Sequence, residues 1–549
     1  MFRFFLLGAT FIAFSSVAQT TPEKLKAITD RSKWTKASQS IHKAIARDSL
    51  DPEPAYLMAL FYFNDKHPTF QVDSASLYLD RSAKVAKIKE RSKRSIPDSA
   101  MVIRLRNSID SAAFERAKQT DTEDAYQFFI TQYASAPKVA AAIELRDEQA
   151  FLKALKTNTS QSFGSFIARY PNSHRTQEAK SRMERLAFDE MTRDKRLVSY
   201  ERFYKEFPRN PFRPLAERKI FELSTAQGSA KSFQRFISTY PDSRWVGRAR
   251  VMIFSLQRDG EQVADGSWKT DSLRRESQRN MGYWVPVIKS GLYGFIDETG
   301  KEVVSPRFKE IPEGYRCGEI TDRYLVTSAG LLARNSHLLW KGKIKDFDDL
   351  GLGFIFVATD SGSFIIHESG FRPIATPVDD AVVIANRFLG INQNDKWSVL
   401  TLLGFPLLQS AYDDIAALDS VIQLTKDRKR ILTTPARIAR VARGMELKED
   451  FVCDDTRKWG DQQYWVRNGI LEGVVDANLN FIIPLDRQVL RKTSFGFLTT
   501  KAEKIFIKGV KKLEGKPYMQ VVEQGGYIRM KDEAGKLWVY FKAFACNPD

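Results

Sequence analysis

Apolar residues recur at helical spacing in the first half of the chain and in short β-rich runs in the second half. Between residues 113 and 256, an aromatic pair three residues apart is followed by a third aromatic residue four positions later. This spacing places one apolar stripe along a helix, and three of the four stripes run into a proline that ends the helix. The four aromatic sets are Tyr126/Phe129/Tyr133, Phe163/Phe166/Tyr170, Tyr200/Phe203/Phe207 and Phe233/Phe236/Tyr240.

These stripes belong to a repeated unit. Each unit opens with a small or aliphatic residue followed by phenylalanine, and the openings recur at nearly constant intervals: Ala113-Phe114, Ala150-Phe151, Ala187-Phe188 and Ile220-Phe221. Nine residues after the third aromatic position stands an alanine, which lets a second helix approach closely: Ala142, Ala179, Ala216 and Ala249. Each unit is therefore predicted to be a helix hairpin that buries its stripe by stacking on its neighbours.

At these residues the chain resembles the tetratricopeptide family, especially the subgroup with an aromatic-Pro-x-Ser turn. The resemblance covers roughly residues 113–256, and residues 37–82 look like one more, degenerate unit. It implies a helical solenoid whose concave surface docks peptides or partner domains. We expect the aromatic stripes to form the core, so docking residues are sought among the polar or basic side chains of the exposed faces. The candidates are Arg169, Lys205, Arg209 and Arg235.

The second half contains seven short runs rich in β-branched and aromatic residues. Their starts are again spaced at similar intervals, and they begin at Tyr293, Gly330, Ser363, Trp397, Arg430, Glu472 and Ile505. After most runs a tight turn containing Gly or Asn leads into a second strand, predicted to start at Glu302, Arg372 and Phe481 in the clearest cases. This pattern predicts a β repeat array with a nearly regular period.

The first of these units, Gly291–Phe308, resembles the WG-repeat family, with Tyr293-Gly294 in place of the leading Trp-Gly. The resemblance spans about residues 284–512. Seven short β units at this period fit a closed, propeller-like domain, in which Tyr527–Ala545 would pair with the first strand, Trp284–Lys289. An open β array is the alternative.

The N-terminal residues have the pattern of a secretory signal. One positive charge at Arg3 precedes an apolar run from Phe4 to Phe14, and small residues precede a cleavage point before Gln19. The predicted organisation is α+β and multidomain: a signal peptide (1–18), a tetratricopeptide-like helical domain (19–256), a linker or cap (257–283) and a WG-repeat-like β domain (284–549). After cleavage no remaining stretch is expected to span a membrane.

Charge is concentrated in the helical half. Residues 21–280 contain 47 Lys and Arg against 33 Asp and Glu, whereas residues 281–549 contain 37 against 34. A basic field of this kind attracts acidic proteins, anionic glycans or lipid headgroups, although a solvated basic face is the simpler interpretation. For an exported protein we do not expect nucleic acid as a partner. The three cysteines, Cys317, Cys453 and Cys546, allow at most one disulfide, whose pairing stays open.

No motif predicts catalysis. The chain lacks a His-Glu-x-x-His sequence, a phosphate-binding glycine loop and a Gly-x-Ser-x-Gly elbow. The five histidines are isolated, and His367 lies within a repeat strand. The acidic pairs Asp348-Asp349, Asp379-Asp380 and Asp413-Asp414 recur near the repeat period. We interpret them as equivalent turns rather than as metal or acid–base sites.

These observations predict a non-catalytic protein, without cofactor or metal, that acts as a protein–protein interaction scaffold in the bacterial cell envelope, periplasmic or at the cell surface. Its partner is expected to be a protein or peptide. Two alternatives stay open: a β domain that binds a glycan, a cell-wall component or another small ligand, and a cryptic hydrolase whose site is assembled from distant units.

Overall fold

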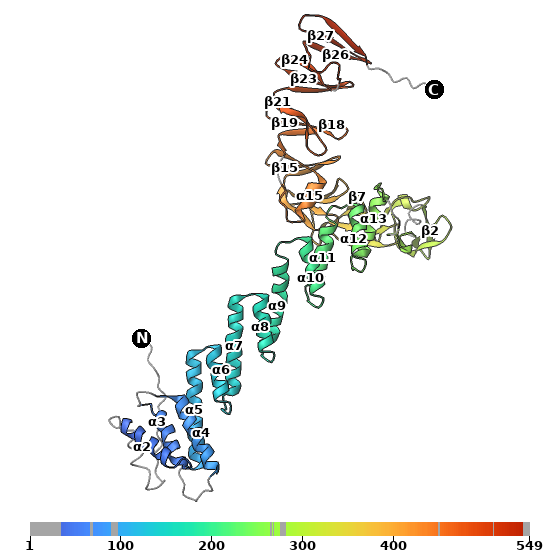
Figure 1. The fold of residues 1–549 in the computed structure, drawn as a ribbon. Helices are drawn as coiled ribbons and strands as arrows, with labels where there is room; N and C mark the ends of the chain where they lie inside the picture. The colour runs from blue at the N-terminus through green and yellow to red at the C-terminus, as the bar shows by residue number, and fades with distance from the viewer. Residues whose placement is uncertain are drawn as a thin grey trace. The chain divides into compact units, whose positions relative to one another are not determined.

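The computed structural model describes residues 34–65, 70–88, 97–263, 266, 268–274, 282–447, 451–508 and 510–541. The predicted signal peptide lies outside these residues. The chain divides into two compact units, Met1–Glu190 and Met191–Asp549. Helices make up the first half and small antiparallel sheets the second (Figure 1). Because the second unit begins at Met191, it contains the last helix hairpins as well as the strands.

The helices alternate between short and long along the repeats. Those whose bounds are described in the first unit are α2 (Trp34–Arg47), α3 (Pro52–Tyr62), α4 (Val72–Ile88), α5 (Ser99–Thr120), α6 (Glu123–Gln132), α7 (Val139–Thr157), α8 (Ser160–Arg169) and α9 (Thr176–Met191). The second unit continues with α10 (Leu197–Glu206), α11 (Arg213–Ser224), α12 (Ala230–Thr239) and α13 (Val246–Arg258), and has α15 (Pro435–Val441) among its strands.

The predicted stripes and alanines form the helical core. Phe163, Phe203 and Phe233 are completely buried. The four repeat alanines are each 0% exposed, so a larger side chain would have no room there: Ala142, Ala179, Ala216 and Ala249. Burying several rings per hairpin against the next hairpin explains why the units need to stack.

The same backbone turn joins successive hairpins. Eight residues after each unit opening the backbone is left-handed, at Asp121, Asn158, Lys195 and Gly228, with φ between 48° and 61°. This conformation ends the long helix. The next residue then starts the short helix, and in three units its hydroxyl accepts a backbone N–H as an N-cap: Thr122, Thr159 and Ser229.

In three of the four units the hydroxyl of the third aromatic residue bonds the hairpin to the one before it. The Tyr133 hydroxyl donates to Asp73 at 2.6 Å, and the Tyr170 hydroxyl donates to Glu123 at 2.5 Å. The Tyr240 hydroxyl donates to Glu201 in the same way. Phenylalanine occupies this position only at residue 207, where the ring has no hydroxyl to donate.

The described strands form eight separate antiparallel sheets. In chain order they are β1 (Trp284–Lys289), β2 (Leu292–Asp297) and β3 (Glu302–Phe308); β4 (Tyr324–Thr327), β5 (Gly330–Ala333) and β6 (Leu338–Lys341); β7 (Asp346–Gly351), β8 (Phe354–Thr359) and β9 (Gly362–His367); β10 (Asp380–Ile384), β11 (Phe388–Gln393), β12 (Lys396–Thr401) and β13 (Pro406–Tyr412); β14 (Asp414–Leu418), β15 (Val421–Lys426), β16 (Lys429–Thr433) and β17 (Val452–Cys453); β18 (Asp455–Gly460), β19 (Gln463–Asn468), β20 (Leu471–Asp476) and β21 (Phe481–Asp486); β22 (Val489–Thr493), β23 (Gly496–Lys501), β24 (Lys504–Lys508) and β25 (Pro517–Tyr518); and β26 (Gln520–Gln524), β27 (Tyr527–Lys531) and β28 (Leu537–Phe541).

All seven predicted β runs are strands: β2, β5, β9, β12, β16, β20 and β24. The eighth sheet, formed by β26, β27 and β28, has no counterpart among the predicted runs. The predicted second strands at Glu302 and Phe481 are confirmed as β3 and β21, but the one at Arg372 is wrong. Pro373 and Pro377 remove two backbone donors from that segment. It closes the edge of β9 instead, because His367 donates to the Phe371 carbonyl and Val378 donates to the Ser363 carbonyl.

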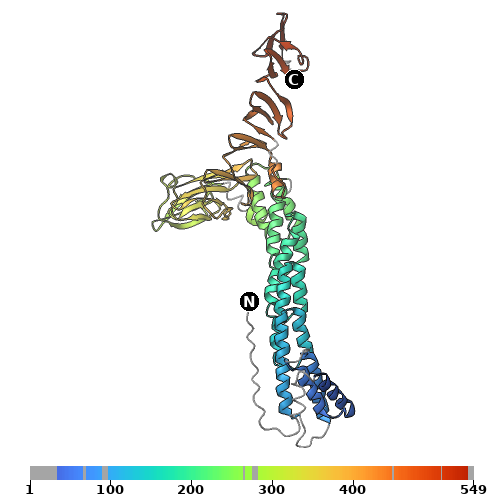
Figure 2. The same ribbon diagram turned by 90° about the vertical axis from the view of Figure 1, so that its left-hand side faces the viewer.

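Consecutive sheets pack face to face. One apolar cluster joins the sheets of Leu498 and Ile528, and another joins those of Val421 and Tyr464. In Figure 2 the last sheets, orange to red, follow one another in chain order. The expected closure through Tyr527–Ala545 is not found among the described residues. Strand β28 pairs with β27, and β1 pairs with β2 apart from a single bridge to Ile320.

Candidate functional site

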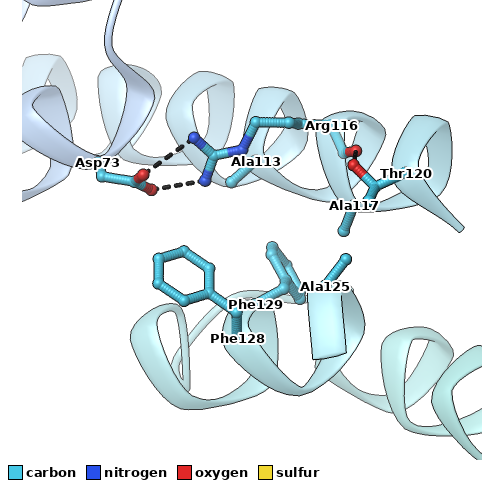
Figure 3. Close-up of a pocket in the computed structure, with 8 residues that line it drawn as sticks. All are labelled: Asp73, Ala113, Arg116, Ala117, Thr120, Ala125, Phe128 and Phe129. Carbon is cyan, nitrogen blue, oxygen red and sulfur yellow. Dashed lines mark hydrogen bonds and ion pairs between the residues drawn. The ribbon is translucent and has the colours of Figure 1, made fainter. Parts of the chain in front are cut away.

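A cavity in the helical part lies between helices α4, α5 and α6. Figure 3 shows Arg116 and Asp73 along one side and the rings of Phe128 and Phe129 on the other. The remaining lining residues are small, namely Ala113, Ala117, Thr120 and Ala125. The cavity volume is about 170 Å³.

Two walls of this cavity differ in character. Arg116 donates from both terminal nitrogens to the Asp73 carboxylate, at 2.9 and 2.6 Å, and Tyr133 donates to the same carboxylate. The guanidinium carbon of Arg116 also lies 5.8 Å from the centre of the Phe128 ring. Phe128 is 45% exposed, whereas Phe129 beside it is buried in the core. The guanidinium is thus held in place next to an open aromatic surface.

The electrostatics favour a permanently charged pair. Burial alone would raise the pKa of Asp73, but the hydrogen bonds from Arg116 and Tyr133 outweigh it and hold the pKa below its ordinary value. The hydrogen bond to Asp73 raises the pKa of Arg116 in turn. The lining therefore offers fixed charges and apolar surface, with no poised acid, base or nucleophile.

The cavity has the size of a single side chain. Pockets that bind cofactors or drug-sized ligands measure roughly 300–1,000 Å³, while an apolar cavity of about 150 Å³ is sufficient for a benzene molecule. A volume of about 170 Å³ therefore suits one aromatic or branched aliphatic side chain of a partner. The ring of Phe128 and the three alanines would supply the apolar contact.

The basic residues singled out in the sequence do not gather at this cavity. Arg169 pairs with Glu123 at 2.7 Å and stacks on the Tyr170 ring. The other three are exposed and form no ion pair within the described residues: Lys205, Arg209 and Arg235. Sequence reasoning missed Arg116 and Phe128. One signal was available: the position equivalent to Phe128 is polar in the next three units, being Ser165, Arg202 and Arg235.

A second polar cluster is buried in the other compact unit, between α13 and the third sheet. Arg258 donates to the Glu368 carboxylate at 2.5 Å, and Tyr324 donates to its other oxygen at 3.2 Å. The Ser255 hydroxyl lies 3.3 Å from both Glu368 and the Nε2 atom of His367. All these side chains are buried or nearly so.

A serine, a histidine and a glutamate in contact resemble a catalytic triad, but the hydrogen bonds of the histidine do not leave it free to accept the serine proton. The backbone N–H of Ser369 donates to His367 Nδ1, so the proton of the neutral ring sits on Nε2, where it faces the Leu352 carbonyl at 3.2 Å. Burial lowers the pKa of His367 to about 3. The histidine therefore has no acceptor to offer Ser255, and the cluster joins α13 to the sheets.

The acidic pairs have structural roles in the successive sheets. Asp379 accepts the backbone N–H of Asn394, and Asp413 accepts that of Asp427. Each acceptor precedes the first strand of its sheet and caps the hairpin between the second and third strands. Asp349 accepts the N–H of Gly351 in a turn of its own. Within the part of the chain that the structure describes, no three Asp, Glu, His or Cys side chains group in a way that could hold a metal ion.

Cys317 is exposed and Cys453 is buried, and neither forms a disulfide. Burial raises the pKa of Cys453 to about 12, so its thiol stays protonated at neutral pH. Cys546 lies outside the described residues. Among the described helices, none is long and apolar enough to cross a membrane.

Comparisons with known proteins add little. No family model matches the chain, and no curated protein matches it. Among solved structures, BamB from Moraxella catarrhalis matches at 11% identity and a TM-score of 0.18, over 35% of this chain and 69% of that one. The computationally designed Ika8 protein matches at 9% identity and a TM-score of 0.18, over 48% and 96%. Scores this low carry no argument about function.

Proposed function

We propose that the protein is an exported, non-catalytic scaffold of the cell envelope that binds a partner protein through its tetratricopeptide-like helical repeats. The observation that carries this proposal is the cavity of α4, α5 and α6, which is too small for a cofactor and suits a single side chain. A helical array that presents such a cavity beside an exposed aromatic ring has the character of a peptide-docking surface.

The proposed location rests on the sequence of the N-terminal residues. Residues 1–18 have the charge, length and small-residue pattern of a cleavable signal. We further propose that the second half is a WG-repeat-like, propeller-related array, on the basis of its regular period and the face-to-face packing of its small sheets. N-terminal sequencing of the mature protein tests the signal, and a first residue other than Gln19 would contradict the proposed cut.

The docking surface is tested by filling the cavity. Ala125→Leu replaces the methyl group of the partly exposed Ala125 in the lining by an isobutyl group, and we expect it to abolish co-purification of the partner from source cells. The matched control is Ala168→Leu, the same exchange at an exposed position of α8. Equal recovery of a specific partner with wild type and Ala125→Leu would refute the site, and equal loss in both variants would indicate a general effect on folding.

A further inference from the structure

Two segments that are far apart in the sequence meet within the second compact unit. One is the turn between α9 and α10, and the other is the loop that follows α15. A Cβ atom added to Gly444 in that loop would lie 4.0 Å from the carbonyl oxygen of Asp194 in the turn. The exposed residues next to Gly444 and next to Asp194 therefore share one region of the surface.

Helix α15 is an insertion in the fifth sheet. Four residues separate the repeated strand from the outer strand in the first, fourth and sixth sheets, whereas 18 residues separate β16 from β17. The inner side of α15 is fixed, because Ile438 and Ala439 are buried in the apolar cluster that contains β13. Arg440 and, just after the helix, Arg443 are exposed. Insertions into a repeat array often form its binding face.

The third helical unit departs from the other three at its turn. Its left-handed residue is Lys195, with φ 55°, whereas the other units have Asp, Asn and Gly, which adopt this conformation more easily. Its N-cap is Arg196, which makes no side-chain cap hydrogen bond, whereas the other units have Thr or Ser. Both changes place a cation where another residue would stabilise the turn. Departures of this kind are typical of functional sites.

Cations dominate the surface where the two segments meet. The acids of residues 193–198 and 440–446 are Asp194 and Glu446, so these segments have an excess of three positive charges. The Asp194 carboxylate is already engaged, since it accepts the Arg196 N–H at 3.0 Å and the Ser199 hydroxyl at 2.9 Å. Five exposed cations, here called the basic patch, form no ion pair within the described residues: Arg193, Lys195, Arg196, Arg440 and Arg443.

Apolar side chains beside the basic patch indicate what kind of partner fits. Val198 is 70% exposed and Met445 is 47% exposed. Guanidinium groups bind carboxylates and phosphates, and the two apolar side chains add contact for a ligand that also carries apolar groups. A membrane surface favours larger anchors such as Trp, Phe or Leu, and the described residues 193–198 and 440–446 have none among their exposed side chains. An acidic segment of a protein matches both the charge and the apolar contacts.

We propose that the basic patch binds a short acidic segment of a partner protein. Carboxylates of the segment pair with the arginines, and its apolar side chains contact Val198 and Met445. Because the patch is built from two segments, the cations of the turn and those of α15 and its loop contribute together. This inference rests on the proposed scaffold function and gives it a second docking surface.

The experiment measures binding of a labelled peptide to the full mature chain by fluorescence anisotropy. The probe is a nine-residue peptide of six glutamates and three leucines, and the control peptide has glutamine in place of glutamate. We expect only the acidic peptide to bind. Two charge reversals, R193E/R196E in the turn and R440E/R443E at α15, should each weaken its binding about tenfold or more, because like charges then face each other.

The matched variant K511E/K512E makes the same charge change at two exposed lysines between β24 and β25, and its affinity should stay close to that of wild type. If a reversal lowers the thermal midpoint, the glutamine variants R193Q/R196Q and R440Q/R443Q take its place, since they remove the charge at the same exposed positions. Equal binding of the two peptides, a loss of binding in only one of the two paired variants, or no binding at about 1 mM peptide would overturn the proposal.

Vesicles of phosphatidylcholine and phosphatidylglycerol serve as a second probe. Vesicle binding that both paired variants abolish, without binding of the acidic peptide, would assign the basic patch to a lipid surface and overturn the proposal. Ala125→Leu, which fills the cavity at Phe128, should leave the affinity for the acidic peptide unchanged. A failure of this inference and a failure of docking at the cavity are therefore distinguishable.

Discussion

Removing the charge of Arg258 is predicted to loosen the junction between α13 and the third sheet. The side chains of Arg258 and Glu368 are 17% and 6% exposed, and their nitrogen and oxygen atoms are 2.5 Å apart. Arg258→Met leaves the carboxylate buried with only Tyr324 and Ser255 as donors. Breaking a buried ion pair from one side costs about 3–5 kcal/mol. Because about 1.4 kcal/mol corresponds to a factor of ten, amides of α13 and β9 that exchange by local opening should exchange at least about a hundredfold faster.

Hydrogen exchange followed by mass spectrometry measures this effect peptide by peptide in the mature chain. The double variant R258M/E368M removes both charges and should restore most of the protection, since apolar replacement of a buried pair is often close to neutral. Arg467→Met is the control, because Arg467 and Asp455 are both substantially exposed and such pairs contribute at most about 1 kcal/mol. Unchanged exchange in R258M, or a double variant as unprotected as R258M, would refute the reasoning.

Three further predictions concern stability. Lys195→Gly should stabilise the helical repeats by about 1 kcal/mol, because Lys195 has φ 55° and only glycine adopts this conformation without a steric cost; a lower thermal midpoint would contradict it. Phe203→Ala should destabilise the helices by about 3–5 kcal/mol, since Phe203 is completely buried, whereas Phe128→Ala at the exposed ring should change the urea midpoint little. His367 should make stability fall with acidification. Its folded pKa is about 3 and its ordinary value 6.5, so below pH 6.5 the unfolded chain binds a proton that the folded chain does not. The free energy of unfolding should drop by about 2 kcal/mol from pH 7 to pH 5, and His367→Gln should remove this part of the slope; an unchanged slope in urea titrations would show that another group causes it.

The helical half was largely predictable because its periodicity is carried by large side chains. The aromatic stripes and the repeat alanines determine which faces meet, and both are visible in the sequence. The left-handed turns were harder to find because four different residue types occupy them: Asp121, Asn158, Lys195 and Gly228. Only their position after each unit opening is constant, and the N-cap hydroxyl that follows is the clearer sign of the turn.

The β half was predictable in its period but not in its edges. The eighth sheet was missed although its signal was present, since β27 and β28 are joined by the same turn as β2 and β3: the N–H of Gly535 donates to the Asp532 carbonyl as that of Gly300 does to the Asp297 carbonyl. The segment after β9 has the turn and the spacing of a strand but contains Pro373 and Pro377, which prevent a full ladder. Whether a segment pairs with the edge of a sheet depends on its backbone N–H donors and on the strands beside it, and an alternating apolar pattern gives no information on either.

The cavity was beyond sequence reasoning for a simpler reason. Asp73 and Arg116 are 43 residues apart, and Asp73 precedes the four regular units, so no spacing rule joins them. Phe128 was the available clue, as an exposed aromatic residue at a position that is polar in the later units.

Photo-crosslinking in intact source cells tests the scaffold account most directly. A photoreactive phenylalanine analogue replaces Phe128 in one strain and Ala168, an exposed residue of α8, in another. The account predicts one specific protein crosslinked from position 128 and absent from position 168, and its crosslink should disappear when Ala125→Leu is added. No crosslinked protein at position 128, or the same products at both positions, would contradict the claim that the helical repeats dock a partner through this cavity.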